Sequence, residues 1–109
     1  MLKLLSLLLV GFTSIGMMAT TASADIKKGQ KGYLKACKAC HGNGTKGASM
    51  QTQDEWNDLF ANGGADIIKR HALTPAKPFF NGDEFKTKSK DLRDFLFEYG
   101  SDSGNVPTC

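Results

Sequence analysis

Two cysteines and a histidine occur at a spacing that can hold a flat, metal-containing cofactor. Residues 37–41 read Cys-Lys-Ala-Cys-His, so Cys37, Cys40 and His41 stand three and four positions apart. Side chains at these separations share one face of a helical turn. The C-x-x-C-H pattern is typical of covalent c-type haem attachment, in which two thiols add to the haem vinyl groups as thioethers. The histidine then binds the iron from the proximal side. The pattern predicts one covalently bound haem c.

Three other uses of such a cysteine pair compete with haem attachment. A thioredoxin-like redox pair needs alternating strands and helices around it, and the sequence shows no such alternation. A zinc site needs further ligands at suitable spacing. Outside the motif only His71 and Cys109 remain among the histidines and cysteines, and they are far apart. A structural disulfide between Cys37 and Cys40 would close a small strained ring. Covalent haem is the interpretation that uses all three side chains of the motif.

The first 24 residues have the layout of a secretory leader. A positively charged start and an apolar stretch at residues 4–12 precede an A-x-A cleavage pattern at residues 22–24. An uncleaved membrane anchor is the alternative, but the apolar stretch is shorter than the roughly 20 residues that a spanning helix needs. No twin-arginine pair precedes it, which favours export as an unfolded chain. We therefore expect cleavage after Ala24 and a periplasmic mature chain, residues 25–109, without a membrane span.

The composition fits one small soluble domain. The chain has 14 Lys and Arg residues against 11 Asp and Glu residues, a formal net charge of +3. Because the lysines are interleaved with acidic residues rather than massed, the sequence does not indicate nucleic-acid binding. A domain of this size buries a modest share of its surface and often needs a covalent or metal staple. A covalently attached haem would serve as one.

The first half of the mature chain is expected to contain two helices. Asp25 can cap a first helix that runs to Cys37. Residues 42–48 are a loop by composition, with three glycines and an asparagine. The sequence Thr-Gln-Asp-Glu at residues 52–55 matches a capping box. The helix that it opens is expected to end at Asn-Gly-Gly, residues 62–64.

The second half is expected to end in one longer helix. Residues 65–72 can form a short helix, and residues 75–88, which contain two prolines, are expected to be irregular. Ser89 can then cap a last helix over residues 90–99, followed by a short loose tail at about residues 101–109. The last helix carries apolar residues at helical spacing: Leu92, Phe95, Leu96 and Tyr99.

With these elements in place, the chain resembles the class I c-type cytochromes over nearly all of its mature sequence. That family carries a glycine eight residues before the first cysteine and an aromatic residue four before it, as Gly29 and Tyr33 do here. Its L-x-x-Y pattern in the last helix is matched by Leu96 and Tyr99. The resemblance implies an all-α, small cytochrome c-like fold. Its N- and C-terminal helices cross, and short helices and loops surround a covalent haem.

The chain departs from that family at the sixth iron ligand. Members usually supply a methionine, in a Met-Pro context before the last helix, whereas this chain has Lys77 before Pro78. His71, the second histidine, is our leading candidate for the distal ligand, because neutral imidazole binds iron well. Met50 is the alternative, and Lys77 would first have to lose its proton. A vacant or water-bound position is a further option.

The expected function is one-electron transfer between periplasmic redox proteins, without catalysis on a substrate. Two alternatives are a haem-based redox or gas sensor and a haem subunit of a larger oxidoreductase complex. Docking to redox partners is expected to be transient and electrostatic, through Lys35, Lys38 and Lys46. Trp56 either donates to a haem propionate or packs in the core. Cys109, the odd cysteine, either forms an intermolecular disulfide or stays a free thiol.

Overall fold

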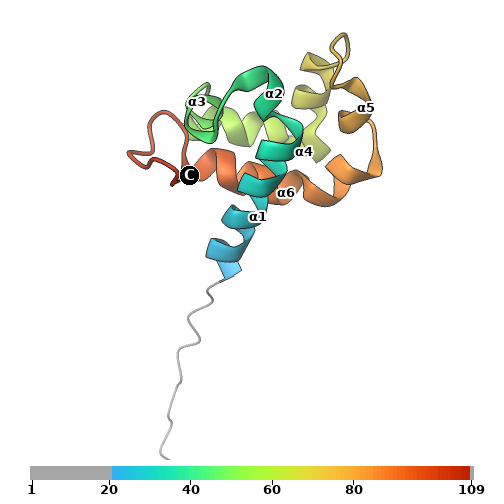
Figure 1. Ribbon diagram of the computed structural model, residues 1–109. Helices are drawn as coiled ribbons and strands as arrows, with labels where there is room; N and C mark the ends of the chain where they lie inside the picture. The colour runs from blue at the N-terminus through green and yellow to red at the C-terminus, as the bar shows by residue number, and fades with distance from the viewer. Residues whose placement is uncertain (1–20, 109) are drawn as a thin grey trace, which may run out of the picture.

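The first and the last helix of the described chain cross each other, and the other helices lie around them (Figure 1). The computed structural model describes residues 21–108, so most of the predicted leader lies outside the described residues. Within this range the chain forms helices and no strand, which confirms the all-α prediction. None of these helices has the length and apolar character that crossing a membrane requires. The elements are α1 (Thr21–Ala36), α2 (Lys38–His41), α3 (Gly44–Ala48), α4 (Gln53–Arg70), α5 (Lys77–Phe80) and α6 (Asp83–Glu98).

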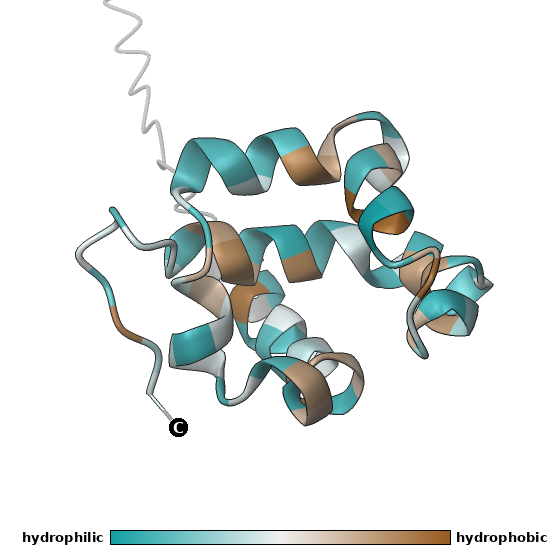
Figure 2. Ribbon diagram, turned by 90° about the horizontal axis from the view of Figure 1, so that it is seen from above, coloured by the Kyte–Doolittle hydropathy of each residue, from teal (hydrophilic) through white to brown (hydrophobic). Residues whose placement is uncertain are grey.

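Helix α6 lies against both α1 and α4 and supplies much of the apolar core. Apolar bands alternate with hydrophilic ones along the helices (Figure 2), which is the pattern of helices with one buried face. Burying one large apolar side chain stabilises the fold by about 1.5–3 kcal/mol. A few such residues therefore account for much of the stability that the core provides. Buried large apolar residues from the three helices are Tyr33, Trp56, Leu59, Ile67, Phe85, Leu92, Phe95 and Leu96.

A glycine allows α1 to approach α6 closely where the two helices cross. Gly29 is buried, and a Cβ atom placed there would overlap the backbone carbonyl oxygen of Asp91 and lie 2.7 Å from the Phe95 Cβ. The Phe95 ring packs against Tyr33, with 5.7 Å between ring centres, and against Tyr99, with 5.3 Å. Phe95 therefore packs where the terminal helices cross, beside Tyr33 and Tyr99, which the family resemblance indicated.

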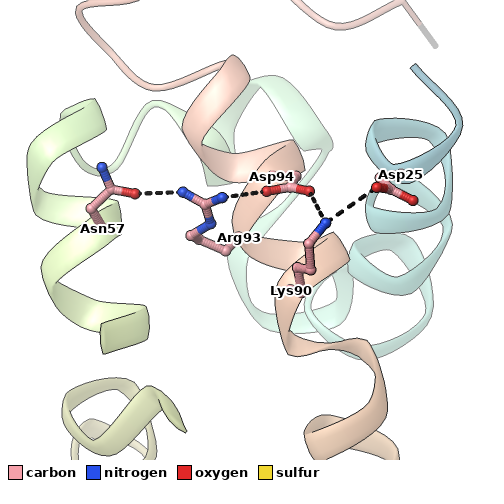
Figure 3. A network of polar contacts seen from close by, with 5 residues as sticks. All are labelled: Asp25, Asn57, Lys90, Arg93 and Asp94. Carbon is pink, nitrogen blue, oxygen red and sulfur yellow. Dashed lines mark hydrogen bonds and ion pairs between the residues drawn. The ribbon is translucent and has the colours of Figure 1, made fainter. Parts of the chain in front are cut away.

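A polar network joins α6 to both neighbouring helices (Figure 3). The Lys90 Nζ donates to a carboxylate oxygen of Asp25 in α1 and of Asp94, each at 3.2 Å. Arg93 donates to the Asn57 side-chain oxygen in α4 at 2.8 Å. The predicted cap at Asp25 is wrong, because α1 begins at Thr21. The Asp25 carboxylate pairs with Lys90 instead, although partly exposed pairs of this kind contribute little stability each.

The segment that follows the C-x-x-C-H motif is partly helical. Residues 42–48 were expected to form a loop, but α3 occupies the last five of them. The Asn43 side-chain oxygen caps α3 by accepting from the Lys46 backbone N–H at 2.9 Å. Asparagine is a favoured N-cap residue, so Asn43 is a local signal for this helix. The three glycines of the segment are typical of loops, and they led to the prediction of a loop instead.

Helix α4 begins and breaks where the sequence predicts. The Glu55 backbone N–H donates to the Thr52 hydroxyl at 3.2 Å, and the Thr52 backbone N–H donates to the Glu55 carboxylate at 3.0 Å. This confirms the capping box. Residues 61–64 have non-helical dihedral angles, and the last three have φ values of 55°, 70° and 82°. The break confirms the predicted helix end, and the chain then resumes as a short helix up to Arg70.

Residues 75–88 were expected to be irregular, and this prediction is wrong. Helix α5 lies within them, and α6 begins at Asp83, so Ser89 lies inside α6 and is not its cap. Proline is tolerated in the first turn of a helix, because its missing N–H would have no partner there. Pro78 occupies such a position in α5. Phe85, which is 1% exposed, extends the apolar face of α6 toward its N-terminus.

Two of the three lysines expected to dock redox partners are free of ion pairs with described residues. Lys38 and Lys46 are exposed and form no such pair within residues 21–108. Lys35 donates to the Glu84 carboxylate at 3.0 Å, as Lys88 also does. These two hydrogen bonds, Lys35's first, lower the pKa of Glu84. Lys35 therefore joins α1 to the start of α6.

The C-terminal segment is held against the helices, which differs from the loose tail expected for residues 101–109. The Gln30 Nε2 donates to the Thr108 backbone oxygen at 2.9 Å. Pro107 is buried and lies beside α3. Cys109, for which an intermolecular disulfide was expected as one option, lies outside the described residues.

Candidate cofactor site

A cavity of about 460 Å³ opens between the C-x-x-C-H motif and the end of α4. Its volume falls in the range of about 300–1,000 Å³ that is typical of small-molecule and cofactor sites. All four cysteine and histidine side chains of residues 21–108 line it. Much of the remaining wall is apolar and comes from α4, α5 and α6: Trp56, Leu59, Ile67, Phe80 and Leu96.

Both cysteines and His41 lie where α1 ends and α2 begins. The Cys37 backbone N–H donates to the Tyr33 carbonyl at 2.8 Å, and the His41 N–H donates to the Cys37 carbonyl at 3.0 Å. The chain therefore stays helical through most of the motif, with Cys37 as the N-cap of α2. This continuity brings both sulfurs and the imidazole to one cavity, as the spacing of three and four residues predicts.

The two thiols have different surroundings. Cys37 is partly buried, whereas Cys40 is exposed, and neither forms a disulfide. Burial, and to a smaller degree the neighbouring Cys40, raises the pKa of the Cys37 thiol to about 11. Cys37 is therefore a neutral thiol near neutral pH. Both sulfur atoms are free to form thioethers.

Tyr33 fixes the chain that leaves the motif. Its hydroxyl donates to the carbonyl oxygens of Gly42, at 2.8 Å, and Asn43, at 3.2 Å. Burial, and to a smaller degree Cys37, raises the pKa of Tyr33 to about 12, so the hydroxyl keeps the proton that it donates. Gly47 leaves room for this arrangement, because a Cβ atom there would overlap the Tyr33 hydroxyl.

The His71 ring faces the His41 ring. The two ring centres are 6.0 Å apart, and the ring planes make an angle of 82°. The Nδ1 of His71 lies 2.7 Å from the Ile67 backbone oxygen. A carbonyl oxygen can only accept, so Nδ1 carries a proton, and in the neutral ring Nε2 then has the lone pair. The His71 ring also stacks on Phe80, with 4.1 Å between ring centres.

The other candidate ligands are placed less directly. Met50 lines the cavity, but it is 46% exposed. Lys77 lies in α5 and is not part of the cavity wall. Arg70 and Gln51 add polar groups to the wall. Of the candidates named from the sequence, His71 has its ring centre 6.0 Å from that of His41 in the same cavity.

Trp56 is a core residue whose polar group already has a partner. Its indole N–H donates to the Ala48 carbonyl at 2.8 Å, and its side chain is 3% exposed. This contact joins α4 to α3. The sequence left two roles open for Trp56, donation to a haem propionate or packing in the core. The structure shows packing in the core.

Replacing Trp56 by phenylalanine is expected to lower thermal stability and to change the reduction potential of the haem-loaded protein little, because phenylalanine keeps this part of the cavity wall apolar. The variant leaves the buried Ala48 carbonyl without its donor, which costs about 1–3 kcal/mol. For a domain of this size each kcal/mol corresponds to roughly 4–8 °C in melting temperature. Circular dichroism and voltammetry check the two parts. An unchanged melting temperature with a shifted potential would place the indole on a propionate.

The donor set fits a metal held between two imidazoles. An imidazole nitrogen binds a transition metal at about 2 Å and lies about 1 Å from its ring centre, so two axial rings need centres roughly 6 Å apart. His41 and His71, at 6.0 Å, meet this requirement. Both thiols line the same cavity as His41. The wall of this cavity is largely apolar, which suits a flat, apolar macrocycle.

The sequence did not reveal the residues that hold His71. Neither the Phe80 ring nor the Ile67 carbonyl was predicted to contact His71. One signal was available for the second of these. His71 follows the last residue of α4, and the last carbonyls of a helix lack intrahelical partners. A polar ring at that position is therefore able to bond one of them.

A comparison with known families agrees with this geometry. The sequence profile of the family described as "Cytochrome C oxidase, cbb3-type, subunit III" matches residues 24–92, well over half of the chain. No curated protein and no solved structure shows significant similarity to the chain. The matched range includes the C-x-x-C-H motif, and the family implies covalently bound haem c. The chain belongs to this family and is a c-type cytochrome of the small, class I-like kind.

Proposed function

We propose that the mature chain is a periplasmic one-electron carrier with one haem c, attached through Cys37 and Cys40. His41 and His71 are the two axial ligands in this proposal. The observation that carries it is the pair of imidazoles that face each other at one cavity, 6.0 Å apart. Family membership supports haem-based electron transfer. Bound haem supplies the Fe(III)/Fe(II) couple, which takes up and releases one electron.

In this proposal the thiols, the imidazoles and the apolar residues around the cavity have different roles. The two thiols would tether the cofactor, and the Nε2 atoms of His41 and His71 would hold the iron. With both imidazoles bound, the iron would have no position open to dioxygen or carbon monoxide. The apolar wall limits the access of water and so influences the reduction potential. This arrangement suits electron transfer better than gas sensing or chemistry on a bound substrate.

A second candidate function is that of a haem subunit in a larger oxidoreductase. The description of the matched family, an oxidase subunit, favours it. The haem chemistry would be the same, and the difference lies in the partner: a carrier forms transient complexes, whereas a subunit stays bound.

The purified, haem-loaded protein tests the proposal directly. We expect one haem per chain that resists extraction with acidified acetone, a low-spin spectrum in both oxidation states, and one reversible one-electron wave. We expect the reduced protein not to bind carbon monoxide. Mass spectrometry should find a chain that begins at Asp25, which tests export. Size-exclusion chromatography should find a monomer with and without reductant.

Each alternative has its own result in the same measurements. Extractable haem would overturn the attachment through the two cysteines. A high-spin spectrum with rapid binding of carbon monoxide would favour the sensor. A near-infrared sulfur-to-iron band would favour Met50 over His71 as the distal ligand. Isolation from native membranes or periplasm in a stable complex would favour the oxidoreductase subunit.

A further inference from the structure

The His71 ring is held on two sides by groups that fix different properties of it. The Ile67 carbonyl oxygen lies 2.7 Å from Nδ1, which fixes the tautomer. The Phe80 ring stacks on the imidazole with 4.1 Å between centres and 21° between planes, which fixes the orientation of the imidazole plane. A ligand that is held in this way approaches a metal with one nitrogen and in one orientation.

The end of α4 makes the carbonyl contact available. The His71 backbone N–H donates to the Ile68 carbonyl at 3.1 Å, not to the Ile67 carbonyl that a continuing helix would use. The Ile67 oxygen therefore lacks its usual helical donor, and the imidazole ring supplies one. The tautomer of His71 thus follows from where the helix ends.

Phe80 is itself fixed by its aromatic neighbours. It is 7% exposed, and its ring centre lies 5.2 Å from that of Phe79 and 5.0 Å from that of Phe85. Phe85 in turn belongs to the core side of α6. Close packing of this kind restricts a side chain to one rotamer. The plane on which His71 stacks is therefore set by the core.

We propose that Phe80 is a positioning residue that keeps the His71 ring nearly perpendicular to the His41 ring when both bind the haem iron. The inference rests on the proposed function and deepens it. The angle between the two rings is 82°. When both rings coordinate one iron, each ring plane contains the axis through the two bound nitrogens. The angle between the rings is then the angle between the ligand planes.

The angle between ligand planes has an electronic consequence. An imidazole interacts most strongly with the iron d orbital that points perpendicular to its ring plane. Parallel rings act on the same orbital and separate it in energy from its partner. Perpendicular rings act on one orbital each, and the two stay nearly equal in energy. A ferric low-spin iron then has strongly anisotropic magnetic properties.

Electron paramagnetic resonance of the ferric holoprotein tests the inference. We expect a single strongly shifted low-field feature in the wild-type spectrum, as perpendicular ligand planes produce. Phe80→Leu removes the stacking ring, and we expect its spectrum to move toward three resolved features of lower anisotropy. Phe80→Tyr keeps the ring and should keep the wild-type signal. Phe60→Leu is the control, because Phe60 packs on Trp56 and Phe85 but does not stack on His71.

Two results would overturn the inference. One is a wild-type spectrum with three resolved features, which needs no variant to interpret. The other is a Phe80→Leu protein that folds and keeps the wild-type signal. The proposed function fails separately, through extractable haem or a sulfur-to-iron band. A protein with covalent haem and two histidine ligands but parallel planes would keep the function and lose only this inference.

Discussion

Replacement of His71 by alanine is expected to open the haem iron to carbon monoxide. In the wild-type protein the two imidazoles face each other at the 6.0 Å separation that two axial ligands need. If His71 is the distal ligand, as proposed, alanine would remove that donor without adding a new one, and the iron would have a position open to an added ligand. The ferrous variant should then bind carbon monoxide completely, while the wild type does not. Optical titration of the reduced proteins measures the difference.

Met50→Ala is the matched control for this variant. Met50 lines the same cavity and is the other candidate distal ligand named from the sequence, but it is 46% exposed. We expect its removal to leave the spectrum and the lack of carbon monoxide binding unchanged. If Met50→Ala opened the iron and His71→Ala did not, the distal ligand would be Met50.

A methionine at position 71 is expected to raise the reduction potential. Compared with imidazole ligation, thioether ligation stabilises ferrous iron relative to ferric iron. The rise should be on the order of 0.1 V, a fraction of the roughly 0.8 V that axial ligands span. An unchanged potential in His71→Met would contradict ligation by residue 71.

The haem motif and both histidines could be named from the sequence because their chemistry depends on residue type and short spacing. Three- and four-residue separations within one helical turn bring Cys37, Cys40 and His41 to one cavity. The position of His71 opposite them depends on the break in α4, on the end of that helix and on the stack with Phe80. The break and the helix end follow from local signals, but the stack with Phe80 depends on packing in the core, so the sequence could name His71 but not show how it is held.

The boundaries of the helices show a similar division. The capping box at Thr52 and the break before Gly64 were predicted because local signals specify them. The start of α6 was missed, since the two prolines suggested an irregular segment. Tertiary packing of Phe85 in the core extends the helix into it. The attachment of the C-terminal segment was missed for the same reason, because it depends on a bond between Gln30 and Thr108.

Replacement of Gly29 by alanine is expected to cause the largest loss of stability of any single methyl addition to α1. The added Cβ would overlap the Asp91 carbonyl oxygen and lie 2.7 Å from the Phe95 Cβ, and backbone atoms cannot turn aside as a side chain can. Helices α1 and α6 must then move apart, which disturbs the packing of Phe95. Overpacking of a core costs about 1–3 kcal/mol and occasionally more, and we expect a loss at or above the upper value. A loss of 3 kcal/mol corresponds to roughly 12–24 °C in melting temperature.

Gly32→Ala separates this steric effect from the general effect of removing a glycine. Gly32 is also buried in α1, but a Cβ atom there would lie 3.4 Å from the nearest atom, a Leu92 methyl group. Alanine favours a helix over glycine by roughly 0.5–1 kcal/mol, so Gly32→Ala should melt at or above the wild-type temperature. Both variants receive the same gain in helix propensity, and the difference between their melting temperatures therefore measures the crossing itself. Equal melting temperatures would mean that α1 and α6 do not meet at Gly29, because the same methyl group is harmless wherever the facing backbone is absent.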